Sequence, residues 1–133
     1  MNCPQCNTPI DEHQATQCLD AWVAETALKK SIAWPAHNEH PAIPGLELWN
    51  EQPRYSSDIA AAWQVVEGFK NFEPDRGGDS GFRVELHASG AFAAIGVYHE
   101  LTIVGASAQT APLAICRAAL KAIEHERTIR NPA

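Results

Sequence analysis

Residues 82–123 read FRVELHASGAFAAIGVYHELTIVGASAQTAPLAICRAALKAI, and this stretch predicts a three-stranded sheet followed by a helix. In FRVELH the residues alternate, so one strand face carries Phe82, Val84 and Leu86 and the other carries Arg83, Glu85 and His87. A turn at 88–90 leads to a more buried strand over 91–98, and a third strand is expected over 99–104. Connections this short favour an antiparallel meander.

A helix is expected to close this stretch, after a loop over 105–109. Thr110 can cap the helix, and Pro112 suits its first turn. The apolar residues recur at helical spacing, at Leu113, Cys116, Leu120 and Ile123. We therefore expect Cys116 to be a buried thiol that packs as a small hydrophobic side chain.

Two further helices are expected upstream. In residues 15–32, one face carries Leu19, Trp22, Val23 and Thr26. Residues 56–58 offer N-cap side chains for a helix DIAAAWQVVEGFK, whose apolar stripe is Ile59, Ala62, Trp63, Val66 and Phe69. The class is α+β, with helices packed on the meander in the order α-α-β-β-β-α. The core order α-β-β-β-α also occurs in double-stranded RNA-binding domains, but residues 109–114 read QTAPLA and lack the lysines that grip phosphates there.

The N-terminal segment carries a candidate zinc site with the spacing C-x2-C-x6-H-x4-C: Cys3, Cys6, His13 and Cys18. Zn²⁺ prefers four such nitrogen and sulfur ligands in a tetrahedron, and a site filled by protein ligands is structural. After Met1, Ile10 is the only large aliphatic residue in this segment, so a metal would have to supply its folding energy. The sequence thus predicts a zinc-knuckle-like segment over 1–18, an α+β domain over 19–128 and a tail over 129–133.

Three alternatives to this site stay open. Cys3 and Cys6 could form a redox pair, although no strand precedes them as in thioredoxin-like folds. His37 and His40 could complete a finger-like site in place of His13 and Cys18. The segment could also be disordered without metal.

The chain has 133 residues and a net charge of −6, which works against general affinity for nucleic acid. Four cations lie toward the C-terminus: Arg117, Lys121, Arg127 and Arg130. They could form a small basic patch on the surface. Alternatively, they follow the common preference for cations near a helix C-terminus, where the helix dipole favours positive charge. Apolar runs fall short of the ~20 residues of a membrane span, and the N-terminal residues do not resemble a signal peptide. We therefore expect the protein in the host cell cytoplasm, without membrane contact.

A proline-rich stretch at 35–54 contains Trp49 and follows directly after Trp34. These two tryptophans could face a ligand, or they could pack in the core or in a lid.

Three segments together resemble the phage ABA sandwich domain family: CLDAWVAE at 18–25, YSSDIAAAWQVVE at 55–67 and TAPLAICRAALKAI at 110–123. The resemblance extends over residues 18–32 and 55–125 and implies a protein of a bacteriophage or prophage. It assigns no activity and no catalytic residue. The Cys/His cluster lies outside the shared part, so its role does not follow from the resemblance.

Three functions stay open at this point. The favoured one is a small non-catalytic binding or regulatory protein that acts on a host factor, a defence component, a phage protein or a small ligand, or that forms a homo-oligomer. A zinc-dependent single-stranded nucleic-acid-binding protein is the second, although residues 1–18 contain no aromatic residue, lysine or arginine. A hydrolase is the third, with His87 and His99 as general bases beside Glu85 and Glu100.

Overall fold

The computed structural model describes residues 2–30, 32, 53–68, 82–97 and 102–130. Its elements are η1 (Ile10–Glu12), α1 (Gln17–Thr26), α2 (Ile59–Gly68), β1 (Phe82–His87), β2 (Gly90–Val97), β3 (Thr102–Ala108) and α3 (Ala111–Arg130). This order confirms the predicted α+β class and the sequence α-α-β-β-β-α. Among the described helices, none combines the length and apolarity that a membrane span requires.

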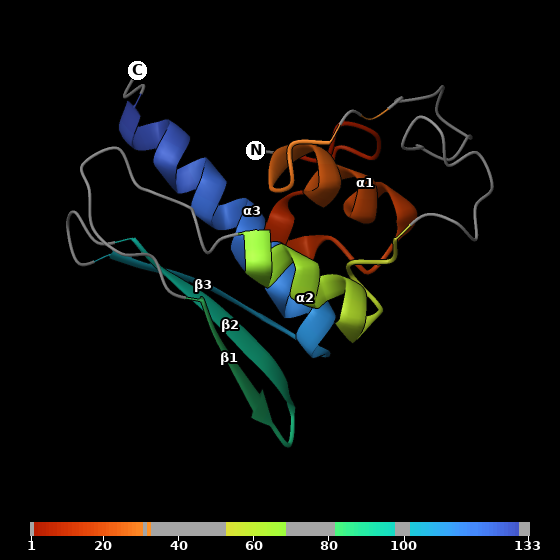
Figure 1. Cartoon of the computed structure of the whole chain (residues 1–133), viewed down its shortest axis with the longest axis vertical. Helices are drawn as coiled ribbons and strands as arrows, with labels where there is room; N and C mark the ends of the chain where they lie inside the picture. Colours follow the sequence, from red (N-terminus) through yellow and green to blue (C-terminus); the bar gives the residue numbers. More distant parts are fainter. Residues whose placement is uncertain (1, 31, 33–52, 69–81, 98–101, 131–133) are drawn as a thin grey trace.

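Helix α3 is the central element of the fold. The sheet lies along one side of it, and η1, α1 and α2 contact it from other directions (Figure 1). The predicted apolar stripe is confirmed, since Leu113, Cys116, Leu120 and Ile123 are all buried. Burial extends around the helix to Ala114, Ala118, Ala119 and Ala122, because layers pack on opposite sides of it. The small alanine side chains allow these layers to approach closely.

The three strands form an antiparallel sheet in the order β1-β2-β3, which confirms the predicted meander. Its face toward α3 includes Val84, Ala93 and Ala106, which lie opposite one another across the three strands. The third strand was expected at 99–104 and a loop at 105–109, but β3 runs from Thr102 to Ala108. Residues 98–101 lie outside the described part of the chain.

Gly105 explains why the expected loop is a strand. It pairs with Ala94, and the ring of Phe92 on β2 covers it: a Cβ atom at position 105 would lie 2.6 Å from Phe92 Cζ. Glycine normally weakens a strand interior, but here the ring takes the space that a side chain would fill.

Gly105→Ala is therefore expected to destabilise the protein by about 1–3 kcal/mol, because the added methyl group overlaps the Phe92 ring. Urea denaturation followed by circular dichroism measures the change. Ser107→Ala is the control, since Ser107 is exposed on the same strand and should shift stability by no more than about 0.5 kcal/mol. Equal effects of the two substitutions would contradict the close approach of Phe92 and Gly105.

Helix α1 is shorter than the predicted 15–32, although its buried face is confirmed: Leu19, Trp22, Val23 and Thr26 are all buried. The helix ends at Thr26 in a reversing turn. Lys29 adopts a left-handed conformation with φ of 58°, and the Lys30 N–H donates to the Ala24 carbonyl at 3.0 Å. This bond spans six positions, satisfies a carbonyl of the last helical turn and stops the helix.

The predicted apolar stripe of α2 is wrong at two positions. Ile59 and Trp63 are 53% and 50% exposed, and the buried residues are Ala61, Ala62 and Val65. Asp58 caps the helix as expected, with its Oδ1 accepting from the Ala60 N–H at 3.0 Å. The buried residues of α2 are small, and α2 packs against the crowded alanine surface of α3. Val66 is half-buried, and Phe69 lies outside the described residues.

Leu86, on the predicted apolar face of β1, is 77% exposed. It lies opposite Ala91, a buried residue of β2. The end of the β1–β2 hairpin projects beyond the helices (Figure 1).

Candidate metal centre

A tight turn at the N-terminus presents Cys3 and Cys6. The Asn7 N–H donates to the Cys3 carbonyl at 2.9 Å, and the Cys3 N–H donates to the Thr8 carbonyl at 3.0 Å. Asn7 closes the turn in a left-handed conformation with φ of 59°, which asparagine tolerates better than most residues. The turn therefore holds two sulfur atoms close together before any metal is considered.

His13 follows the short helix η1 and is 3% exposed. Its Nδ1 lies 2.8 Å from the Gln14 carbonyl oxygen. A carbonyl can only accept, so the proton sits on Nδ1 and the lone pair of Nε2 is free for a metal. A backbone carbonyl that fixes the ring in this way is the usual partner of a metal-binding histidine.

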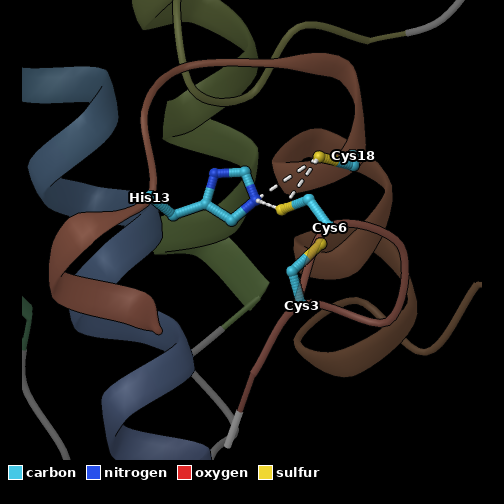
Figure 2. A group of neighbouring side chains, drawn as sticks. All are labelled: Cys3, Cys6, His13 and Cys18. Atoms are coloured by element: carbon cyan, nitrogen blue, oxygen red, sulfur yellow. Dashed lines mark hydrogen bonds between the residues drawn. The ribbon is translucent and has the colours of Figure 1, made fainter. Parts of the chain in front are cut away.

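Cys18 lies in the first turn of α1 and completes the cluster (Figure 2). One ligand atom from each of Cys3, Cys6, His13 and Cys18 lies within 4.8 Å of all the others. The four residues predicted from the sequence are thus brought together in a site that could hold a metal ion.

The distances fit a tetrahedral ion. Zinc bond lengths at tetrahedral angles place two sulfur atoms about 3.8 Å apart and a sulfur and a nitrogen atom about 3.6 Å apart. The Sγ atoms of Cys6 and Cys18 are 3.8 Å apart, and His13 Nε2 lies 3.2 and 3.4 Å from them. Only movements of a few tenths of an ångström are needed along these three edges.

Burial and hydrogen bonding set the pKa values of the three thiols differently. Burial raises the pKa of Cys3, and burial also raises the pKa of Cys18 to about 12 against the opposing effect of Thr16. Burial acts in the same direction on Cys6, but hydrogen bonds with the Thr8 hydroxyl and backbone outweigh it and lower the pKa of Cys6 to about 7. Thr8 Oγ1 is 3.1 Å from Cys6 Sγ, and Thr16 Oγ1 is 3.3 Å from Cys18 Sγ, so each hydroxyl can donate to a metal-bound thiolate.

Arg117 ties this cluster to the rest of the protein. Its Nε and Nη2 donate to the His13 carbonyl at 3.2 and 2.7 Å, and its Nη1 donates to the Ser107 carbonyl at 3.0 Å. Both readings of Arg117 from the sequence were therefore wrong: it is buried near the start of α3, neither in a surface patch nor at the helix C-terminus. Lys121 pairs with Asp11 at 3.2 Å.

A second long-range contact was missed by the sequence reasoning. Asp20 is buried on α1, and its Oδ1 accepts from the Ser56 N–H at 2.7 Å and from the Ser56 hydroxyl at 2.6 Å. Burial raises the pKa of Asp20 to about 6, against the lowering effect of these bonds. Ser56 was expected only as a cap candidate, and nothing in the local pattern pointed to Asp20.

Asp20→Ala is expected to destabilise the protein by about 1–3 kcal/mol, because the Ser56 N–H then stays buried without an acceptor. The midpoint and slope of urea denaturation report the change. Asp58→Ala is the matched control: it removes an exposed cap on α2 and should cost about 1 kcal/mol or less. A smaller effect at Asp20 than at Asp58 would contradict the assignment.

Several other candidates lie outside the described residues: Trp34, His37, His40, Trp49, His99 and Glu100. The proposed ligand role of Trp34 and Trp49 stays a prediction. His87 and Glu85 are described, and their side chains approach to 3.6 Å on the surface of β1. Arg127 is exposed on α3, as a patch residue would be.

The sequence model of the phage ABA sandwich domain matches residues 21–120. The chain belongs to the phage ABA sandwich domain family. The match begins after Cys18, so all four residues of the candidate metal centre precede the part that defines the phage ABA sandwich domain. Asp20 also precedes it, whereas Trp22, Ser56 and Arg117 lie within it.

A solved structure supports the same fold. The chain resembles a crystal structure of a phage protein from Bacillus cereus ATCC 14579, with a TM-score of 0.53 and 20% sequence identity. The likeness covers 83% of this chain and 93% of that chain. At this identity the likeness extends to the fold alone. A search of curated proteins returned no match.

Proposed function

We propose that this chain is a zinc-containing, non-catalytic binding protein, in which Zn²⁺ holds the N-terminal segment against the helices. The observation that carries this proposal is that the ligand atoms of Cys3, Cys6, His13 and Cys18 lie within 4.8 Å of one another. The three distances among Cys6, His13 and Cys18 are close to tetrahedral values. Three thiolates and one imidazole favour zinc over Mg²⁺ or Ca²⁺, which prefer oxygen ligands.

The site would be structural, because the protein fills all four positions of the tetrahedron. A catalytic zinc keeps a position for water or substrate, and this donor set leaves none. The zinc would supply folding energy to a segment whose own burial is small, with Cys3 and Ile10 as its buried apolar residues.

Binding is the role that we infer for the whole chain, within an infected host cell, on a host factor or a component of its defence. Membership of a phage family supports this setting. A hydrolase is less favoured for the His/Glu pair that the structure describes. The side chains of Glu85 and His87 are 44% and 55% exposed. Water around such a pair screens the interactions that tune a general base.

Metal analysis of the purified protein tests the zinc site. We expect about one zinc per chain by mass spectrometry, and loss of zinc in Cys3→Ser. Two matched controls should keep the metal: Cys116→Ala removes a thiol of the core, and His87→Ala removes an exposed imidazole. Zinc that persists in Cys3→Ser, or that disappears in either control, would overturn the assignment of ligands.

The binding role needs a separate test. Affinity capture from host lysate and a metabolite screen would each use the zinc-loaded chain. A captured protein supports the proposal only if it binds the wild-type chain stoichiometrically after separate purification. Light scattering shows whether the partner is a second copy of the chain, and labelled oligonucleotides at several salt concentrations test the nucleic-acid alternative. Absence of any stoichiometric partner or ligand would contradict a binding function.

A further inference from the structure

A cavity of about 360 Å³ lies beside the metal centre, at the first turns of α3. Its walls come from four parts of the fold: the segment around η1, the β1–β2 turn, the end of β3 and α3. Most of its lining is polar, through Asp11, Gln14, Ser89, Ser107, Gln109 and Arg117. Its size falls in the range of small-molecule sites.

Arg117 gives this cavity a buried positive charge. The residue is 8% exposed, and the hydrogen bonds found for it in the described structure go to the carbonyls of His13 and Ser107. These acceptors are uncharged. A guanidinium group has five N–H donors, and three are used here, which leaves two. Its hydrogen bonds go to neutral carbonyls, so an anion in the cavity would give the guanidinium a directly bonded charged partner.

The start of α3 adds to the positive field in the cavity. Gln109 lies just before this helix and Leu113 in its first turn, so the cavity adjoins the N-terminus of a twenty-residue helix. The partial positive charge of a helix N-terminus favours anions. Asp11 is the acidic member of the lining, and Lys121 lies 3.2 and 3.3 Å from its two oxygens, which offsets its charge.

We propose that this cavity binds a small oxyanion, the phosphate or carboxylate group of a small molecule, with Arg117 as its principal charge partner. The proposal rests on the binding function inferred above and names its ligand class. Ser89, Ser107, Gln14 and Gln109 also line the cavity, and each carries a side chain that can donate a hydrogen bond. The candidate metal centre shapes one wall of the site. The His13 carbonyl accepts from Arg117, and the next residue, Gln14, lines the cavity.

The zinc-loaded protein is titrated with inorganic phosphate and, separately, with acetate, at constant ionic strength, and amide chemical shifts are followed by NMR. We expect saturable shifts confined to the cavity residues, with a Kd of about 1 mM or tighter for at least one anion. A response to phosphate alone identifies a phosphate ligand. A response to acetate identifies a carboxylate ligand or a general oxyanion site.

Arg117 is too buried for a clean substitution, so the matched variants change glutamines. Gln109→Glu places a negative charge at the exposed rim, next to a helix N-terminus that tolerates it, and should weaken binding about tenfold. Gln64→Glu makes the same change on the exposed face of α2 and should leave the Kd within about twofold.

Two results would overturn the proposal: no saturable shift at the cavity with either anion, or equal weakening by the two glutamine variants, which would indicate general surface charge. Zinc content is measured in each sample. Full zinc without anion binding rejects this cavity and leaves the zinc assignment standing, whereas absent zinc counts against the proposed function itself.

Discussion

Removal of the proposed zinc ion is expected to unfold the whole domain, beyond the first eighteen residues. Structural zinc contributes roughly 10–16 kcal/mol in small metal-binding segments, which matches or exceeds the ~5–15 kcal/mol total stability of an ordinary domain. The site is also continuous with the core. Cys3 and Ile10 belong to the same buried cluster as Leu19 and Leu120, and Arg117 donates to the backbone of His13.

The experiment compares helical circular dichroism and hydrogen exchange before and after chelation under reducing conditions. We expect loss of protection along α3 and recovery when zinc is restored. The same chelator saturated with zinc is the control, because it cannot extract the ion. If only residues 1–18 lose protection, the predicted boundary after residue 18 separates two independent units and the expected coupling is contradicted.

Trp22→Ala is expected to destabilise the protein by about 3–5 kcal/mol, while Trp63→Ala changes stability by less than about 1 kcal/mol. Both residues lie on helices and carry the same side chain, so the difference reports burial. Trp22 is 2% exposed, and its ring centroid lies 6.1 Å from that of His13. Trp63 is 50% exposed on α2.

Urea denaturation of the two zinc-loaded variants measures this difference, and their zinc content shows whether Trp22 also supports His13. We expect Trp22→Ala to bind zinc less tightly, since it removes one wall of the buried histidine. Similar unfolding midpoints for the two variants would contradict the assigned orientation of α2 and α1.

The clustering of the four candidate ligands was predictable because its information is local. The four ligand residues fall within eighteen positions, and their spacing satisfies the donor number of a tetrahedral ion. The meander was predictable for a similar reason, since alternation and short turns act between neighbours in the chain. The exception was β3, where the loop-like glycine and small residues at 105–108 are held in the sheet by pairing with β2 and by the Phe92 ring.

The orientation of α2 could not be read from its sequence. IAAAWQVVEG has apolar residues around most of the helix, so its periodicity does not choose between the face with Trp63 and the face with Ala62 and Val65. The choice is made by α3, whose dense alanine surface accepts small partners. Leu86 was similarly assigned to the same face of β1 as Val84, yet it is 77% exposed. Which part of that face is buried depends on the elements that pack over the sheet.

The residues themselves thus determined the candidate ligands, the strands and the buried stripe of α3, because each depends on spacing along the chain. Tertiary structure alone decided the contacts of Arg117 with His13, 104 residues away, and of Asp20 with Ser56, 36 residues away. Arg117 and Asp20 are both buried charged side chains. Each bonds to the partner that the folded chain places beside it. No local pattern contains that partner, since it is set by how helices α1 and α3 pack.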